Sequence, residues 1–520
     1  MTDLVTPEGD AGRRATFGAS LALAGIMVTA LTVGGKLAAF AHDVVLSQLF
    51  GATEASDAFF IANFIPGILW TAFFATINVV FLPIYIRGLA RSAEEGRKLA
   101  SEGAITYATL GVVVGAVCAL SAETIVRWSA PESSATTQEL ARQLTVMMAA
   151  GFAFSGYVAV QNAIQQANGH YLSPLSIPLI NNLIAISGLF TAALFQDLRI
   201  GVAAMVLAWV VQAPIQRLQT RAYYSTTRLA VRSHTIRSLT LLSVPVLLGT
   251  FIDQVNIFVG LHLASNFGEG AISHLNYASR LALFLATTFS ILVSYFLFPR
   301  LSSEASTGND SGSATTLELG LLLIVGATLP LAAVTFLLSG DIVRLVYGHG
   351  ALSEDDLVRT AGALGFFVIG AVFIAVRELL NRLFFSQQRN VAPMAAGAVA
   401  VTANVVISSW ASARMGLNGV ALGASLSAVL YCVCQVALIR FWKPGLLRAR
   451  NLVNLGWILG ACLVALGATQ LLLPALAGWP LLARLLLAAL VYGLAFAVGV
   501  APLLHLRRHL LLRNSYQEGS

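Results

Sequence analysis

Long apolar stretches, separated by short polar segments, follow one another along almost the whole chain. A helix needs about 20 mainly apolar residues to cross the hydrocarbon core of a bilayer. The pattern therefore predicts fourteen membrane-spanning helices, and Pro66 predicts a bend in the second of them. Their limits fall near residues 17–41, 57–86, 99–121, 143–165, 171–195, 200–222, 238–262, 275–299, 317–339, 358–385, 391–412, 417–441, 452–474 and 481–505.

Composition supports a membrane protein and excludes two other classes. Of the 520 residues, 57% are hydrophobic and 11% are charged, and the mean hydropathy is +0.79. A soluble protein carries about 25% charged residues, so we expect neither a soluble globular enzyme nor a disordered chain. The four cysteines lie in apolar runs without a CxxC pair, which is typical of small core residues.

The distribution of charge predicts the orientation of the chain. The formal net charge is +7, and most of the 31 Lys and Arg residues fall in segments that the predicted spans place on one side of the membrane. Such an excess marks the cytoplasmic side, so both termini are expected there. Basic and aromatic residues do not interleave on any polar surface, which excludes nucleic acid as a partner.

Short strings from the first half of the chain return in the second half, in the same order and at nearly equal spacing. Each copy holds six spans, an even number, so both copies enter the membrane with the same orientation. This predicts two six-helix lobes related by a pseudo-two-fold axis along the membrane normal, enclosing a central cleft. The matched pairs are Phe50-Gly51 and Phe267-Gly268, Pro83 and Pro299, Arg127 and Arg344, Gln165-Gln166 and Gln387-Gln388, and Gly201 and Gly419.

The repeat sets the expected domain organisation. An N-terminal lobe is expected over residues 1–222 and a C-terminal lobe over 238–441, joined by an arginine-rich cytoplasmic linker at 223–237. Two additional helices and a cytoplasmic tail would occupy residues 442–520.

Ionisable side chains inside apolar spans are costly and normally face a cavity or a partner. Lys36 in the first span and Arg280 in the eighth come from matching regions of the two lobes. Two cations would attract an anionic headgroup, and a phosphate or pyrophosphate suits Lys and Arg donors. The alternative for Lys36 is a side chain that extends to the outer membrane interface.

Three polar residues border the same region: His42 and Asp43 at the outer end of the first span, and Asp57 at the start of the second. Each is a candidate substrate contact. The alternatives are an interfacial role for His42 and a role as helix-end caps for the two aspartates. For Asp57 a further alternative is a partner of the helix dipole in the first turn.

Two further pairs of polar residues lie inside predicted spans. One is a candidate ion site, and the other is expected to have a structural role. Asp253 and Asn256 in the seventh span offer oxygen ligands to a monovalent cation, but Asp253 could equally be a hydrogen-bonded structural group. Arg377 and Glu378 in the tenth span are adjacent and face mostly different ways, so we expect them to form ion pairs with neighbouring helices.

The sequence carries no sign of catalytic chemistry. It contains no phosphate-binding loop, no HExxH zinc motif and no nucleotide-binding fingerprint, and its polar segments are too short for a soluble catalytic domain. We therefore assign no catalytic residue, metal or cofactor. Transport would draw its energy from the membrane potential or from a bound monovalent cation.

Three strings resemble a known family: LFGATEASDAFF at 49–60, DIVRLVYGHGAL at 341–352 and RELLNRLFFSQQRNVAP at 377–393. They are similar to the MurJ/MviN family of the MOP (multidrug/oligosaccharidyl-lipid/polysaccharide) exporter superfamily, and the similarity covers almost the whole chain. The resemblance implies a fourteen-helix, two-lobe transporter of bacterial inner membranes. It also implies that lipid II, the undecaprenyl-pyrophosphate-linked peptidoglycan precursor, is its substrate.

The resemblance extends to the candidate residues. Arg280 matches a cavity arginine of the family, and Asp57 matches the acidic residue of its DAFF string. Lys36 and His42 stand where the family usually has arginines. The arginine that His42 replaces is the one directly before Asp43. Near Trp70, near Ala75 and at Ser279, this sequence has uncharged residues where the family has charged ones.

We expect a flippase that moves an undecaprenyl-pyrophosphate-linked glycan of the lipid II type to the periplasmic leaflet by alternating access. Its partners would be the lipid-linked glycan, the bilayer and proteins of cell-wall or exopolysaccharide synthesis. A lipid-linked exopolysaccharide unit is an alternative substrate. Alternatives of another class are a membrane-embedded transferase acting on a lipid carrier and a non-transporting scaffold for cell-wall synthesis.

Overall fold

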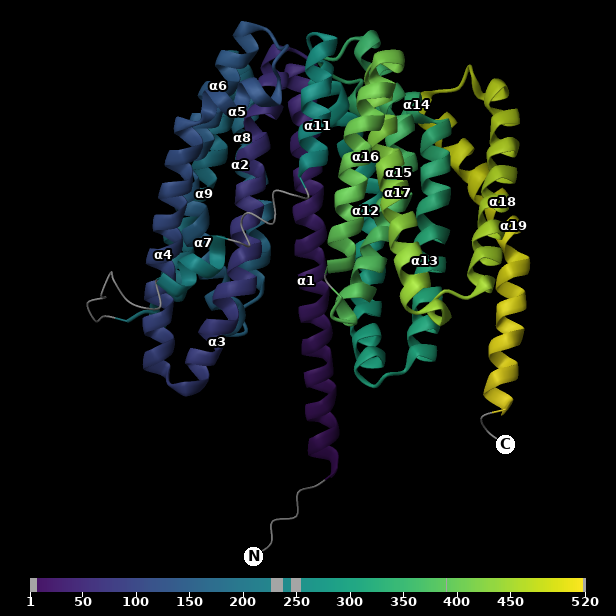
Figure 1. Cartoon of the computed structure of the whole chain (residues 1–520), viewed down its shortest axis with the longest axis horizontal. Coiled ribbons are helices and arrows are strands. Elements are labelled where there is room, and N and C mark those ends of the chain that lie inside the picture. The colour runs from purple at the N-terminus through teal and green to yellow at the C-terminus, as the bar shows by residue number, and fades with distance from the viewer. Residues whose placement is uncertain (1–6, 226–236, 245–253, 390, 518–520) are drawn as a thin grey trace, which may run out of the picture. The chain divides into compact units, whose positions relative to one another are not determined.

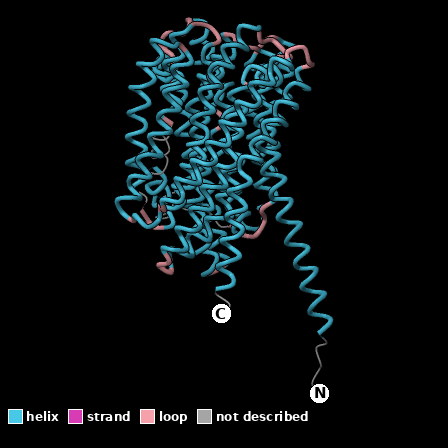
Figure 2. Tube along the Cα trace, turned by 90° about the vertical axis from the view of Figure 1, so that its right-hand side faces the viewer, coloured by secondary structure: helices cyan, strands magenta, loops and turns pink. Residues whose placement is uncertain are grey.

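The computed structural model describes residues 7–225, 237–244, 254–389 and 391–517. Within these residues the chain forms helices and turns and contains no strand (Figure 2). Eleven of these helices are long and apolar enough to cross a membrane, or up to 12 if a bent pair is one span. The prediction of an all-helical polytopic membrane protein is confirmed. The seventh predicted span falls partly on residues 245–253, outside the described residues, so the count of fourteen stays a prediction.

The described chain divides into two compact units, one ending at Gln254 and the other beginning at Val255. Two short segments of the N-terminal half, Phe50–Asp57 and Ser129–Ser134, belong to the C-terminal unit. The expected linker at 223–237 falls mostly on residues 226–236, outside the described residues. The relation of two lobes by a pseudo-two-fold axis stays a prediction.

The first half of the chain supplies nine α-helices among the described residues (Figure 1). They are α1 (Pro7–Phe50), α2 (Glu54–Thr76), α3 (Leu82–Arg91), α4 (Ala93–Leu120), α5 (Ala122–Ser129), α6 (Ala135–Ala149), α7 (Phe152–Ala167), α8 (Leu172–Phe195) and α9 (Leu198–Thr220). A π-helix, η1 (Ile77–Phe81), joins α2 to α3, and a 3-10 turn, η2 (Arg221–Tyr223), follows α9. Residues 237–244 are also helical.

The C-terminal unit contains the remaining described helices. They are α11 (Val255–Ala264), α12 (Ala271–Ser306), α13 (Asp310–Leu337), α14 (Ser339–Tyr347), α15 (Glu354–Ser386), α16 (Val391–Met415), α17 (Leu417–Trp442), α18 (Ala449–Leu472) and α19 (Leu481–Gln517). Three short 3-10 turns, η3 (Ser265–Phe267), η4 (Pro444–Leu446) and η5 (Leu473–Leu476), connect them.

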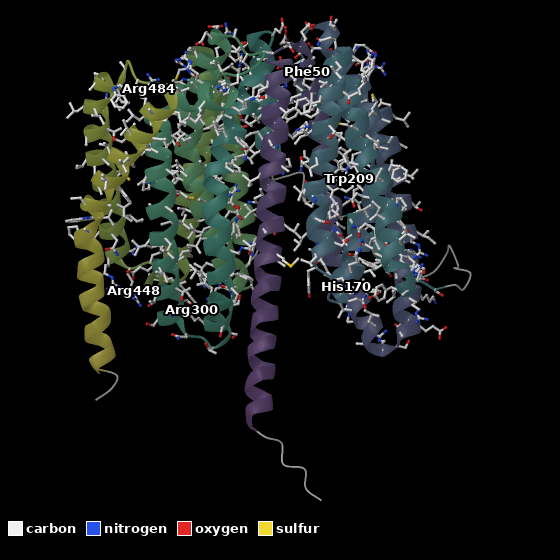
Figure 3. The ribbon with its side chains drawn as sticks, turned by 180° about the vertical axis from the view of Figure 1, so that it is seen from behind. Phe50, His170, Trp209, Arg300, Arg448 and Arg484 are labelled. Atoms are coloured by element: carbon white, nitrogen blue, oxygen red, sulfur yellow. The ribbon has the colours of Figure 1, made fainter. Side chains whose placement is uncertain are left out.

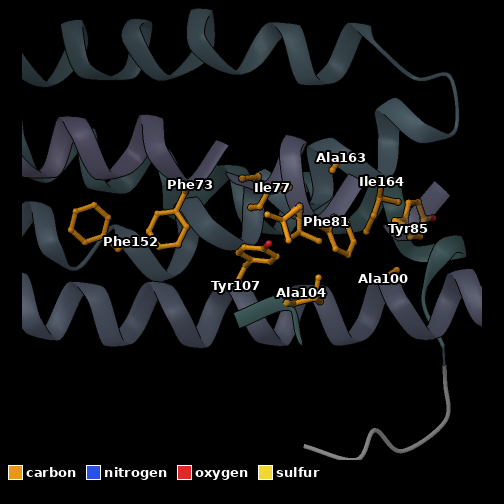
Figure 4. Close-up of a cluster of buried hydrophobic side chains, with 14 of the residues drawn as sticks. Phe73, Ile77, Phe81, Tyr85, Ala100, Ala104, Tyr107, Phe152, Ala163 and Ile164 are labelled. Atoms are coloured by element: carbon orange, nitrogen blue, oxygen red, sulfur yellow. The ribbon is translucent and has the colours of Figure 1, made fainter. Parts of the chain in front are cut away.

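The N-terminal unit is held together by aromatic packing and close helix contacts. Phe73, Phe81 and Tyr107 are fully buried in one cluster that joins α2, η1, α4 and α7 (Figure 4). A Cβ at Gly156 of α7 would lie 2.5 Å from the carbonyl oxygen of Tyr107 in α4. Glycine therefore permits the close approach of these two helices, as small residues do in membrane bundles.

One local prediction was wrong, and a second stays a prediction. The first helix continues to Phe50 instead of ending near residue 41, and Gly51, with φ +64°, then ends it. The second span continues as α-helix through Pro66, so the bend expected there stays a prediction, and the hydrogen-bond pattern of the span changes at η1. Pro83, which follows η1 at the start of α3, lacks an N–H and clashes with a preceding carbonyl in a regular helix, so the irregular turn lies where Pro83 requires it.

The two halves of the chain share one feature in the order of their helices. Each half places a short helix, α5 or α14, directly after a long one, α4 or α13. These short helices carry the repeated Arg127 and Arg344. Arg127 pairs with Glu123 at 2.7 Å, and Arg344 pairs with Glu354 at the start of α15.

The last two helices of the C-terminal unit, α18 and α19, pack together and are joined to its other helices by ion pairs. Arg448 and Arg450 at the start of α18 reach Glu318 of α13, and Arg484 of α19 pairs with Asp341 of α14. Arg448 and Arg484 lie toward opposite ends of the α18–α19 pair (Figure 3). The pair is therefore fixed at both ends.

Candidate functional site

Asp57 of α2 caps the start of another helix, α12. It lies in the first turn of α2, is 4% exposed, and its carboxylate accepts three hydrogen bonds from the start of α12. The donors are the Gly270 N–H at 2.8 Å, the Ser273 N–H at 2.8 Å and the Ser273 hydroxyl at 2.6 Å. The first N–H groups of a helix have no partner inside it, and its dipole favours an anion there. The expected cap is therefore formed on α12. We call Asp57, Gly270 and Ser273 the Asp57 cap.

The segment 50–57, which connects α1 to α2, is held by further contacts within the C-terminal unit. The hydroxyl of Tyr277 donates a hydrogen bond to the carbonyl oxygen of Gly51 at 2.8 Å. Gly270 has φ +77°, and a Cβ there would lie 2.4 Å from the carbonyl oxygen of Ala52. The backbone of the segment thus lies directly against the first turn of α12.

His274, which the sequence did not single out, extends this network to α15. It is 1% exposed; its Nδ1 lies 3.1 Å from the Thr360 hydroxyl and its Nε2 3.3 Å from an Asp356 oxygen. Asp356 also forms a capping box with Ser353 at the start of α15. The first turns of α12 and α15 are therefore joined through buried polar contacts.

The two predicted substrate cations lie on helices of different units. Lys36 is half-buried in α1, beside Gly35, whose Cβ position lies 3.2 Å from Pro178 of α8. Arg280 is exposed on α12, two turns after Ser273 and so on the same helix face. Whether the two cations bind one substrate together stays a prediction.

His42 and Asp43 lie inside α1, not at its end. The His42 Nδ1 and an Asp43 oxygen are 3.4 Å apart, and both residues are 6% exposed. The expectation that Asp43 caps a helix end is wrong, because the helix continues for two more turns to Phe50. Among the described residues, the His42 Nε2 is buried without a hydrogen-bond partner.

The predicted ion site is described only in part, because Asp253 lies outside the described residues. Asn256 of α11 accepts a hydrogen bond from the Asn404 side chain of α16 at 2.9 Å, and the Asn404 oxygen accepts one from Ser408 at 2.8 Å. In the part of the chain described, no three His, Cys, Asp or Glu residues gather where a metal could bind. The ion site stays a prediction.

Arg377 and Glu378 pair with each other. Their side chains lie 3.2 Å apart on α15 and are 32% and 40% exposed. The guanidinium also lies 5.3 Å from the ring centre of Tyr431 on α17. The expected ion pairs with neighbouring helices are thus replaced by a pair within one helix and a cation–π contact.

Two buried carboxylates escaped the sequence analysis. Glu102 of α4 is 0% exposed and Glu318 of α13 is 1% exposed. The spans were predicted to begin at 99 and 317, so both residues fell at the polar ends of spans. The helices begin earlier, at Ala93 and Asp310, which places both carboxylates inside the folded units.

Solved structures of other proteins have a similar fold. The structure is similar to a solved structure described as "Lipid II flippase MurJ, inward closed conformation", with TM-score 0.79, 20% identity and coverage of 92% of this chain and 100% of that chain. It is also similar to an inward-facing multidrug resistance MATE family transporter of the MOP superfamily, with TM-score 0.66 and 14% identity over 81% of this chain and 98% of that chain.

The sequence comparisons agree with the fold. A "Probable lipid II flippase MurJ" of Rhizobium tropici is 25% identical over 422 residues, 78% of this chain and 79% of the relative. The family model described as "Lipid II flippase MurJ" matches residues 46–499, which include Asp57 and Arg280 but not Lys36 or His42. Since this match covers most of the chain, the protein belongs to the lipid II flippase MurJ family, a family of membrane transporters and not of enzymes.

Proposed function

We propose that this protein moves lipid II from the cytoplasmic to the periplasmic leaflet of a bacterial inner membrane, with both termini in the cytoplasm. The observation that carries the proposal is the family match over residues 46–499. Curated relatives of this family are named for lipid II, including the one from Rhizobium tropici. Partner proteins of cell-wall synthesis stay a prediction.

The proposed substrate contacts are the cations Lys36 and Arg280, helped by His42. A guanidinium donates two parallel hydrogen bonds to phosphate oxygens, and an ammonium acts as a compact point charge. Arg280 is suited to this role because it is exposed on α12 although it lies in an apolar helix. An ionisable group in such a helix is retained where it contacts a polar ligand or a polar cavity.

We propose the Asp57 cap as the contact that changes during transport. In this conformation it holds segment 50–57 on the first turn of α12, while α2 continues from Ala58 within the N-terminal unit. Each hydrogen bond to a charged group contributes about 1.5–3 kcal/mol, so three such bonds stabilise one conformation but can be broken in a transport cycle. Lipid II would favour a second conformation only by binding it more tightly.

The energy source stays a proposal with two candidates. The membrane potential supplies about 2.3 kcal/mol per elementary charge per 100 mV, which is enough to bias a charged headgroup across the bilayer. A monovalent cation held by Asp253 and Asn256 is the other candidate. The hydrogen bond from Asn404 to Asn256 supports this second candidate, because it orients an amide oxygen at that position.

A lipid-linked exopolysaccharide unit is a second candidate substrate. The observation that favours it is local: Lys36 and His42 stand before residue 46, outside the matched range, and replace two arginines expected from the family pattern. Both substrates share a polyprenyl pyrophosphate, so the same cations would bind either. The two substrates differ in their glycan, so the glycan that the protein accepts would distinguish them.

The test is rescue of cells depleted of their own lipid II flippase. Expression of this protein should restore growth and intact cell walls, and the Arg280→Ala variant should not, while Arg300→Ala serves as a control on the same helix. Arg300 is exposed and pairs with Glu304, away from the proposed contacts. Failure of the native protein to rescue, with the protein present in the membrane, would contradict lipid II as the substrate.

A further inference from the structure

One end of the C-terminal unit carries a group of basic residues. Helices α12, α15 and α17 end on this side and α13, α16 and α18 begin there, at the end where Figure 3 labels Arg300 and Arg448. Three of the basic side chains are exposed and one is half-buried, and all lie near the end of α15 or α17 or just beyond it. We call them the basic cluster: Arg382, Arg389, Arg440 and Lys443.

Trp442 holds two members of the basic cluster beside one aromatic ring. The Arg389 guanidinium carbon lies 4.2 Å from the ring centre and the Lys443 nitrogen lies 5.2 Å from it. Each contact is a cation–π attraction, but the two positive charges repel each other because they share one ring. A guanidinium that stacks on a ring keeps the N–H groups of its edge available as donors. An anion beside Trp442 would relieve the repulsion and accept these hydrogen bonds.

The protein supplies little negative charge to the basic cluster. Among the described residues, one member has an acidic partner within 4 Å: Lys443 lies 2.6 Å from Asp310. Arg382 instead lies 5.2 Å from the ring centre of Phe298. The other acidic residues of this region belong to separate ion pairs, namely Arg300–Glu304, Glu318–Arg450 and Arg377–Glu378. Three of the four positive charges are therefore left without a counter-charge from the described part of the chain.

Apolar side chains stand exposed beside the basic cluster. Phe441, which precedes Trp442, is 91% exposed, and Val391 at the start of α16 is 77% exposed. Met394, one turn later on α16, is 64% exposed. Trp is typical of the level at which lipid headgroups meet acyl chains, and apolar residues there face the chains. A soluble anion has no part that such a surface would bind, whereas a phospholipid has a charged head and apolar chains.

We propose that the basic cluster and Trp442 bind the headgroup phosphate of an anionic phospholipid of the surrounding bilayer. Arginine donates two parallel hydrogen bonds to phosphate oxygens, and basic residues at the membrane surface attract anionic lipids. The lipid supplies the negative charge that the described protein lacks at this place. Its acyl chains cover the exposed side chains of Phe441 and Val391.

The pyrophosphate of a transported lipid offers similar chemistry, but the basic cluster lies far from the proposed substrate cation on the same helix bundle. Arg280 and Phe298, which contacts Arg382, are about 27 Å apart along α12 at the rise of an α-helix. A cluster at the end of the unit meets bilayer lipids at all times, whereas a substrate passes through. The inference does not depend on which lipid is transported.

Thermal unfolding of the purified, detergent-solubilised protein tests the proposal without any variant. A ligand that binds only the folded state raises the melting temperature. We expect phosphatidylglycerol, which carries a net negative charge, to raise it more than phosphatidylcholine, which carries the same phosphate without net charge. High salt should reduce the difference, and inorganic phosphate should not reproduce it. Equal effects of the two phospholipids would overturn the proposal.

Two variants locate the binding site. Since each Lys or Arg near an anionic surface contributes a similar amount, Arg389→Gln combined with Arg440→Gln should remove about half of the rise with phosphatidylglycerol. Arg414→Gln is the matched control: Arg414 lies 4.2 Å from the ring centre of Trp410, at the other end of α16, and should leave the rise unchanged. An equal loss in the control and the double variant would contradict a site at Trp442.

Undecaprenyl pyrophosphate distinguishes a bilayer lipid from a transported one. If the basic cluster binds phospholipid, the Arg389→Gln and Arg440→Gln double variant should lose stabilisation by phosphatidylglycerol and keep stabilisation by undecaprenyl pyrophosphate. The reverse result would assign the basic cluster to the transported lipid and overturn the proposal. The melting temperature of the double variant without added lipid shows whether it is folded.

Discussion

The carboxylate of Asp57 accepts hydrogen bonds from both the backbone N–H and the hydroxyl of Ser273, at 2.8 and 2.6 Å. Asp57 lies in the first turn of α2, and Ser273 lies in the first turn of α12. One aspartate therefore joins two segments that are far apart in the sequence. This relationship makes the Asp57 cap the contact that experiments can change most selectively.

A double-mutant cycle measures the coupling between these two residues. Ser273→Ala removes the hydroxyl donor, and Asp57→Asn removes the charge and one acceptor. We expect each variant to lower the free energy of unfolding by about 1–2 kcal/mol and the pair to be coupled by about 1 kcal/mol. Denaturation of the detergent-solubilised variants provides the values. Ser279→Ala is the control, since Ser279 donates only to the Asn276 carbonyl of its own helix, and it should show no coupling to Asp57→Asn.

The close approach of segment 50–57 to α12 predicts a large effect of Gly270→Ala. A methyl group there would lie 2.4 Å from the Ala52 carbonyl oxygen, and φ is +77°. We expect a loss of about 3 kcal/mol in the free energy of unfolding, part from the backbone conformation and part from the displaced segment. Gly308→Ala is the matched control: φ is +67° and nothing lies within 4 Å. It should cost only about 1–2 kcal/mol. Equal losses in the two variants would contradict the contact with Ala52.

The Glu318–Arg450 pair predicts a non-additive response. Arg450→Gln leaves a buried carboxylate with a weaker partner, and we expect a loss of about 3 kcal/mol in stability. Adding Glu318→Gln should restore much of that loss, because two neutral amides need no charge compensation. Unfolding measurements on the two single variants and the double variant give the comparison. A double variant as unstable as the sum of the single ones would show that the pair does not act as a unit.

The packing of α4 against α7 predicts that Gly156 tolerates no side chain. Gly156→Ala would place a Cβ 2.5 Å from the Tyr107 carbonyl oxygen, so the two helices would have to separate. We expect a loss of about 2–3 kcal/mol in the free energy of unfolding. Gly326→Ala on α13, where nothing lies within 4 Å, should be neutral or slightly stabilising, since alanine favours a helix more than glycine does. Similar stability of the two variants would refute the close approach.

The hydropathy pattern predicted most spans because a membrane helix must be apolar wherever it meets lipid. It was accurate where the helices end in polar loops, as for α8, predicted at 171–195 and observed at Leu172–Phe195. It failed at α1, where His42, Asp43 and Ser47 are polar but buried by neighbouring helices, so the helix continues through them. Polarity marks a span's end only where the side chain faces water.

The candidate residues show a similar limit. Unusual charges in apolar stretches led to Asp57 and Arg280, but only the tertiary structure reveals that Asp57 caps α12. His274 was missed because a single histidine carries no pattern. Glu102 and Glu318 could have been found by comparing charged positions between the two copies of the repeat, since they share the spacing of Pro83 and Pro299.

The most direct test of the central claim is leaflet exchange of labelled lipid II in vesicles that contain only the purified protein, with a membrane potential imposed. We predict exchange well above that of protein-free vesicles, reduced at least about tenfold by Arg280→Ala, which corresponds to about 1.4 kcal/mol or more in the barrier, and unchanged by Arg300→Ala. Exchange equal to that of protein-free vesicles, with the native protein correctly folded and inserted, would contradict the claim that this protein is a lipid II flippase.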